Sequence, residues 1–230
     1  NRCCDNYPTH ELGPIAKLLD INRGNRIMTV SSFASKSAGL SEYIKTRVDA
    51  TDEMKAANFA QGDIITTVLT CARGETILLR LDTTLPRSYS RDFTIRGTKG
   101  LYMQDTNSVF LDGDEEAFEP VKYYAKALNN AVKFEDEYLP DIWKSVTEEM
   151  LKAGHGGMDW FAYMGFTNAL INGEEMPIDV YDAATWQAVA VLSEMSIKQG
   201  GAPQIMPDFT NGKWFKRPRK DVCEFGDRES

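Results

Sequence analysis

The pattern of hydrophobic and polar residues predicts one helix and one strand near the start of the chain. Apolar residues recur at helical spacing over residues 10–22, with Thr9 as the N-cap and Gly24 placed to end the helix. Residues 26–33 alternate between apolar and polar in the manner of a strand. Residues 36–62 are polar and mixed, which predicts a short helix and a loop.

The middle of the chain predicts antiparallel strands. Two strand patterns, at residues 63–73 and 76–84, are joined by the tight turn Gly74-Glu75, which indicates a hairpin. Further strands are predicted at residues 89–96, 101–104 and 108–111. Because short turns join these segments, we expect a mostly antiparallel sheet of about five to seven strands.

The last third of the chain predicts helices followed by an irregular end. The helical patterns cover residues 142–152, 158–172 and 183–198. Asp182 is placed to cap the last helix, an acidic loop is predicted at residues 112–119, and prolines mark an irregular tail at about residues 202–230. Strands grouped before helices are typical of an α+β fold, here an open, mostly antiparallel sheet with helices packed on one face. We expect residues 1–230 to form a single domain.

The composition excludes several classes of function. Hydrophobic residues make up 42% of the 230 residues, enough for a core, and no apolar run approaches the roughly 20 residues that span a membrane. A net charge of −8 argues against a nucleic-acid surface. We expect the basic run at residues 213–220 to be a solvated tail or a packing arm.

Metal and dinucleotide sites have no signature in the sequence. The four cysteines lack C-x-x-C spacing and the two histidines lack ligand spacing, so no metal site is predicted. Cys71 lies in a strand pattern and is expected in the core. The sequence has no G-x-G-x-x-G fingerprint for a dinucleotide. The chain begins at Asn1, without an initiator methionine, and we expect a preceding segment.

Candidates for acid–base chemistry reduce to two histidines, His10 and His155. His10 ends the run Y-P-T-H at residues 7–10, in which Pro8 keeps Tyr7 extended. The first turn of a helix disfavours an imidazolium, so His10 is expected to be neutral and able to act as a base or a hydrogen-bond donor. The alternative is a helix entrance with a buried Tyr7.

Two further segments carry groups suited to ligand binding. Arg87 and a second arginine flank Tyr89 at a loop-to-strand transition, where guanidinium groups suit carboxylate, phosphate or sugar-hydroxyl contacts. The alternative there is an edge-strand ion pair. Three glycines surround His155 and allow the backbone to approach a ligand closely. The alternative is a flexible connection between helices with Asp159 as an N-cap.

Four segments, in the same order along the chain, resemble glycoside hydrolase family 109, whose members are NAD-dependent α-N-acetylgalactosaminidases and relatives within the Gfo/Idh/MocA oxidoreductase superfamily. Residues 7–14, Y-P-T-H-E-L-G-P, are similar to the family's Y-P-T-H-G-L-G-P. The other matches are residues 82–91 with 97–100 (D-T-x-x-P-R-P-Y-S-R…G-T-K-G in the family), 154–159 (G-H-G-G-M-D) and 179–184. Glu11 stands where the family usually has glycine, and Ser88 where it usually has proline.

The resemblance implies that residues 1–230 are the C-terminal domain of a two-domain enzyme. Its missing N-terminal part would be a Rossmann domain that holds NAD, so this part alone is expected to be inactive. The implied reaction oxidises C3 of the sugar, eliminates the aglycone, adds water and reduces C3 again. The free face of the sheet commonly supports homo-oligomers in this superfamily.

The same resemblance implies roles for individual residues. The expected catalytic pair is Tyr7 and His10, and the expected substrate-binding residues are Tyr89, Thr9, Arg87 and His155. No residue of this chain is expected to bind the cofactor. Two alternatives stay open: the C-terminal domain of a sugar oxidoreductase with net redox turnover, and a non-catalytic carbohydrate-binding or oligomerisation module. The compartment is left open between the bacterial periplasm or cell envelope and the cytoplasm.

Overall fold

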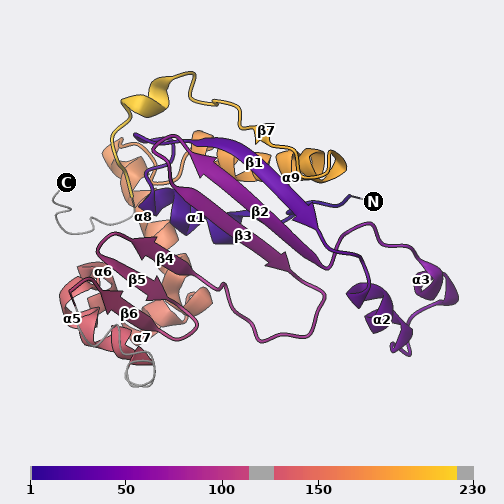
Figure 1. The fold of residues 1–230 in the computed structure, drawn as a ribbon. Helices are drawn as coiled ribbons and strands as arrows, with labels where there is room; N and C mark the ends of the chain where they lie inside the picture. The colour runs from indigo at the N-terminus through magenta and orange to yellow at the C-terminus, as the bar shows by residue number, and fades with distance from the viewer. Residues whose placement is uncertain (1, 114–126, 222–230) are drawn as a thin grey trace. The chain divides into compact units, whose positions relative to one another are not determined.

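The structure, a computed structural model, describes residues 2–113 and 127–221. They form two compact units, one made of Asn1–Arg87 with Glu175–Asp221 and the other of Ser88–Glu174 (Figure 1). The fold is α+β, as predicted, with an open four-stranded sheet in the first unit and a three-stranded sheet in the second. The organisation of residues 1–230 as a single domain stays a prediction.

The first sheet has the strand order β3-β2-β1-β7. Its strands are β1 (Ile27–Ala34), β2 (Ile64–Cys71), β3 (Thr76–Asp82) and β7 (Gln204–Ile205), and each neighbouring pair is antiparallel. The register places Val30 opposite Leu69 and Leu69 opposite Ile77, and all three are buried. The predicted hairpin is confirmed, and the alternation along each strand assigns one face of the sheet to the core.

Two helices, α1 (Thr9–Leu18) and α9 (Val180–Lys198), cover the buried face of this sheet (Figure 1). The shared core contains Leu12, Ala16, Ile21, Ile27, Val30, Leu69, Cys71, Ile77, Leu79, Trp186, Val189, Leu192 and Met206. The burial of Cys71 confirms its predicted place in the core. Two short helices, α2 (Gly39–Lys45) and α3 (Asp52–Ala56), follow β1.

The first helix is shorter than predicted. Pro8 is its N-cap and Thr9 its first residue, which corrects the assignment of Thr9 as the cap. The helix stops at Leu18 because the following turn contains Asp20 and Asn22 with φ angles of 54° and 66°. Such positive φ values cannot continue a right-handed helix.

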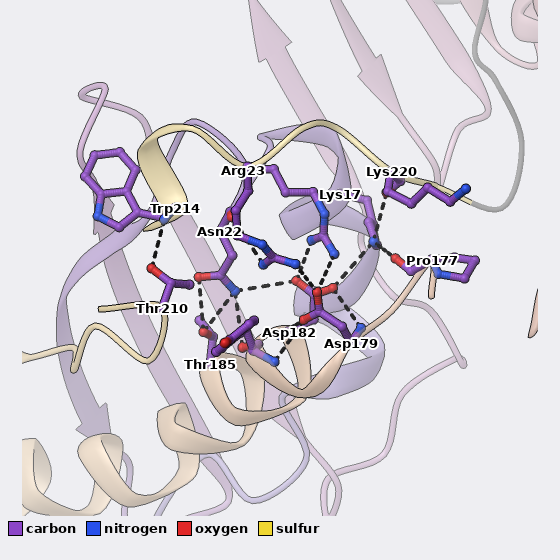
Figure 2. Close-up of polar contacts among 12 residues, drawn as sticks. Lys17, Asn22, Arg23, Pro177, Asp179, Asp182, Thr185, Thr210, Trp214 and Lys220 are labelled. Carbon is purple, nitrogen blue, oxygen red and sulfur yellow. Dashed lines mark hydrogen bonds and ion pairs between the residues drawn. The ribbon is translucent and has the colours of Figure 1, made fainter. Parts of the chain in front are cut away.

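A buried cluster of charges fixes the start of α9 (Figure 2). The N-cap is Asp179, whereas Asp182, predicted as the cap, is the third helical residue and completes a capping box. Arg23 pairs with Asp182 at 2.8 Å and with Asp179 at 3.0 Å. Lys17 Nζ lies 3.6 Å from the Asp182 carboxylate. The side chains of Arg23 and Asp182 are only 3% and 2% exposed, so water does not offset their charges. Each buried charge is offset by the other instead.

The C-terminal arm (residues 207–221) packs against this cluster. Arg217 binds the Asp179 carboxylate, and Arg219 binds Asp20 through two guanidinium nitrogens. Burial raises the pKa of Asp179, but hydrogen bonds from Arg217 and from the helix backbone hold that pKa below its ordinary value. Of the two structures predicted for the basic run, the packing arm is the one observed.

The second unit holds a separate antiparallel sheet of β4 (Thr94–Gly97), β5 (Gly100–Met103) and β6 (Ser108–Leu111). Its helical segments are η2 (Asn130–Phe134), α5 (Glu135–Tyr138), α6 (Asp141–Lys144), α7 (Glu148–Leu151), η3 (His155–Gly157) and α8 (Met158–Asn172). The single helix predicted at residues 142–152 is two helices, because the Thr147 hydroxyl caps α7 by accepting the Met150 amide at 3.3 Å.

Two predictions reach beyond the described residues. Residues 114–119 of the predicted acidic loop lie outside them, as do residues 222–230 of the predicted tail. Among the helices that the structure describes, none is both long enough and apolar enough to cross a membrane.

Replacing Arg23 with methionine is expected to lower the free energy of unfolding by about 3–5 kcal/mol, because Asp182 would stay buried without its closest cation. Urea unfolding followed by circular dichroism measures this loss. Arg47→Ala is the control, since Arg47 pairs with Asp49 in solvent, and its unfolding midpoint is expected to match the wild type. Equal midpoints for both variants would contradict the prediction.

Candidate functional site

The structure brings Tyr7 and His10 together at the start of α1. Their rings stack with centroids 4.6 Å apart and planes 29° apart. Pro8 between them is buried and Thr9 is half-buried, so the turn is anchored while both rings reach solvent. Tyr7 is 55% exposed, which rules out the alternative of a buried tyrosine at the helix entrance.

Two carboxyl groups flank this pair, and one of them, Asp5, was not singled out from the sequence. Asp5 is fully buried, and its amide donates to the Ser193 hydroxyl of α9 at 2.9 Å. Neither of its carboxyl oxygens makes a hydrogen bond of normal geometry with the described residues. Burial raises the pKa of Asp5 to about 6, against the opposing effect of the Thr67 hydroxyl and the Tyr7 amide.

The second carboxyl is Glu11, which directly follows His10. Its Oε2 atom is buried and has no hydrogen-bond partner in the part of the chain that the structure describes. Burial and then the nearby charge of Asp5 raise the pKa of Glu11 to about 7, although the Arg80 amide and the Arg87 guanidinium lower it. A carboxyl in this state is protonated over part of the neutral range.

Arg87 lies in the same unit, directly after the β3 edge. Its Nε and one Nη atom donate to the Asp82 carbonyl at 3.0 and 2.7 Å, and the guanidinium lies 3.6 Å from the Asp82 carboxylate. Arg87 therefore forms an ion pair with Asp82 of the edge strand β3, which was the alternative to a ligand contact. The exposed Arg87 guanidinium also lowers the pKa of Glu11 through its charge.

Tyr89 and His155 lie in the second unit. Tyr89 is 81% exposed. His155 Nδ1 lies 2.9 and 3.0 Å from the two carboxylate oxygens of Asp159. Gly157 caps α8, so the predicted N-cap role of Asp159 is wrong, and Asp159 holds His155 instead.

The glycines around His155 are required by this turn. Gly154, Gly156 and Gly157 have φ angles of 90°, 65° and 94°, which other residues rarely adopt. A Cβ atom at Gly154 would lie 2.5 Å from the Asp159 carboxylate. The motif therefore builds the His155–Asp159 pair, and the predicted substrate contact of His155 stays a prediction.

The chemistry available at the start of α1 is proton transfer. A phenol and an imidazole lie in contact, and His is the side chain that most readily exchanges a proton near neutral pH. Among the described residues there is no cluster of three or more His, Cys, Asp or Glu side chains that could hold a metal ion. The strand pairs of both sheets are antiparallel, so they do not form the parallel strand–turn–helix cradle of a dinucleotide site.

An open antiparallel sheet with helices on one face, and an exposed tyrosine–histidine pair where the first helix begins, define an α+β domain with a candidate acid–base site. The family model described as glycosyl hydrolase 109, C-terminal domain, matches residues 1–216. The chain belongs to this family, which confirms the resemblance drawn from its motifs.

Individual relatives agree with this membership. The chain is 42% identical over 220 residues to a glycosyl hydrolase family 109 protein of Stenotrophomonas maltophilia (strain K279a), covering 95% of this chain and 46% of the relative. It is 40% identical over 213 residues to an alpha-N-acetylgalactosaminidase of Tannerella forsythia, covering 93% and 44%. For an alpha-N-acetylgalactosaminidase of Shewanella oneidensis (strain MR-1) the identity is 35% over 209 residues, covering 90% and 45%. The chain spans less than half the length of these relatives.

Proposed function

We propose that this chain is the substrate-binding part of a glycosidase that acts on α-N-acetylgalactosaminides or related glycosides. The observation that carries the proposal is the stacked and exposed Tyr7–His10 pair at the start of α1. Membership of the family and the names of two relatives support the substrate class. The proposal concerns a full-length enzyme, because the relatives are about twice as long as this chain.

The proposed reaction is hydrolysis by oxidation, elimination, addition and reduction. A ketone at C3 of the sugar acidifies the proton at C2, loss of that proton expels the aglycone, water adds at C1, and C3 returns to an alcohol. NAD, when bound, would supply the hydride acceptor and donor for C3. The described residues do not fit a dinucleotide, so we assign NAD to residues outside this chain.

Tyr7 and His10 are proposed to move the protons of this reaction. Elimination needs one group to take the C2 proton and another to protonate the leaving oxygen. An imidazole can accept a proton and a phenol can donate one, and stacking holds the two groups in a fixed mutual arrangement. Neither role needs the pair of carboxylates that ordinary glycosidases use.

The remaining candidates are proposed to contact the sugar. Thr9 lies between the two catalytic candidates, and Arg87 presents guanidinium donors suited to hydroxyl groups. Tyr89 and His155 belong to the second unit and are assigned to the substrate on the family resemblance alone.

We also propose that the open face of the first sheet pairs with a second copy of the chain. On that face the register aligns Ser31 with Val68 and Leu78, while the row of Phe33 and Thr66 ends at Arg80 of β3. Phe33 and Leu78 are 56% and 58% exposed there, and Ile205 of β7 is 79% exposed. Exposed apolar side chains are typical of the centre of a protein interface.

Tyr7→Phe and His10→Ala in the full-length enzyme are each expected to lower kcat/KM by about 100- to 10,000-fold, the range for loss of an acid–base group. Release of phenol from an aryl α-N-acetylgalactosaminide measures the change. Tyr43→Phe is the matched control, because Tyr43 has the same exposure as Tyr7 in the same unit. Undiminished activity in both site variants would reject the assignment. Accumulation of NADH in proportion to phenol would favour net redox turnover instead.

Residues 1–230 alone are expected to bind no NAD. Isothermal titration calorimetry on this part of the protein and on the full-length protein tests the assignment of the cofactor. Heat of binding is expected with the full-length protein only. Clear binding by residues 1–230 would show that the cofactor site lies within this chain.

Leu78→Glu is expected to dissociate the oligomer, because it replaces an exposed apolar side chain of the open sheet face with a charge. Size-exclusion chromatography with light scattering measures the mass. Val48→Glu is the control, since Val48 is fully exposed outside the sheet and its variant is expected to keep the wild-type mass. An unchanged mass for Leu78→Glu would place any interface elsewhere.

A further inference from the structure

Two carboxyl groups, the carboxyl pair (the buried Asp5 and the half-buried Glu11), bracket the Tyr7–His10 segment. Asp5 precedes Tyr7 by two residues, and Glu11 directly follows His10. Asp5 is fully buried, and neither carboxyl oxygen makes a hydrogen bond of normal geometry with the described residues, although the Thr67 hydroxyl and the Tyr7 amide lower its pKa. Glu11 buries Oε2 without a partner among the same residues. Buried polar groups are normally hydrogen-bonded, so three such oxygens beside one turn call for a physical explanation.

The elements that the structure describes around Asp5 present neutral groups to its carboxyl. From β2 it meets the neutral Thr67 hydroxyl, and from α9 the neutral Ser193 hydroxyl receives its amide hydrogen. The Thr67 hydroxyl is also engaged with Ser32 at 2.8 Å. The charge of Asp5 acts on the other member of the pair, because it raises the pKa of Glu11.

Among the described residues, Glu11 has one cation that offsets its charge. The guanidinium of Arg87 faces it from the segment after β3, while Arg80 of β3 contributes through its backbone amide. Arg87 is itself shared with Asp82. Two carboxylates and one shared cation leave an excess negative charge in a buried place, which costs free energy that a proton on either carboxyl removes.

We propose that Asp5 and Glu11 are positioning residues for Tyr7 and His10, and that they hold the acid–base segment in its stacked geometry only while the pair keeps a proton. The inference rests on the proposed function. Because the two groups interact, they titrate as a pair rather than as independent sites.

The pKa values support the direction of this effect. Both are raised, Asp5 to about 6 and Glu11 to about 7. A raised pKa means that the folded state binds the proton more tightly than the unfolded chain, so stability falls as pH rises through these values. Ionisation of the pair above these pH values therefore destabilises the folded arrangement of residues 5–11.

The test is the pH profile of kcat/KM for the full-length enzyme with an aryl α-N-acetylgalactosaminide, between about pH 5 and pH 9. The wild type is expected to lose activity as pH rises past about 7, and Glu11→Gln, which cannot ionise, is expected to lack that limb. Asp5→Asn is expected to move the limb to lower pH, because it removes the charge that repels ionised Glu11. Glu42→Gln is the control, since Glu42 lies in the first turn of α2 but in solvent.

A second measurement does not need turnover. Ring signals of Tyr7 in nuclear magnetic resonance, identified with Tyr7→Phe, report its stacking on His10. The wild type is expected to show a change of these signals with pH that Glu11→Gln removes. If Glu11→Gln removes this pH-dependent change while the wild type shows no glycosidase activity, the proposed function is rejected but the positioning role is supported. Identical profiles and identical ring titrations in wild type and Glu11→Gln would overturn it.

Discussion

The pairing of Arg23 with Asp182 and Asp179 is the interaction on which the first unit depends. It joins the turn after α1, the start of α9 and, through Arg217, the C-terminal arm. These segments are far apart in sequence, so their relative placement cannot come from local turns. Burying charges is expensive, and the cost is offset here because each buried charge has a geometrically close partner. A helix cap and a long-range ion pair therefore share the same carboxylates.

The position of the candidate site depends on where these ion pairs hold α9. Once α9 is fixed, Trp186 packs against Gly13 of α1, where a Cβ atom would come within 3.5 Å of the indole ring. Further along α9, the Ser193 hydroxyl holds the Asp5 amide. The segment that carries Tyr7 and His10 thus lies between two contacts to one helix. A shift of α9 would displace both ends of that segment together.

The sequence predicted the parts of this protein that follow from periodicity. Residues 158–172 and 108–111 have the bounds of α8 and β6, and the hairpin and the fold class are confirmed. Tyr7 and His10 were predicted as a pair from the family resemblance, because Tyr7 precedes the N-cap Pro8 and helical spacing does not apply to it.

What the sequence could not show are the buried polar groups. Arg23 and Asp5 stand among polar neighbours, where a charged residue is normally exposed, and their partners are more than 150 positions away. Two aspartates three residues apart both fit the rule for an N-cap, so only the structure distinguishes Asp179 from Asp182. The start of α9 buries charges that pair with one another, whereas Asp5 beside the same helix has no cation partner among the described residues. Stability alone would favour an apolar residue at that position. A polar group that costs stability and lies beside an acid–base pair is the kind of local conflict that folded proteins retain at functional sites.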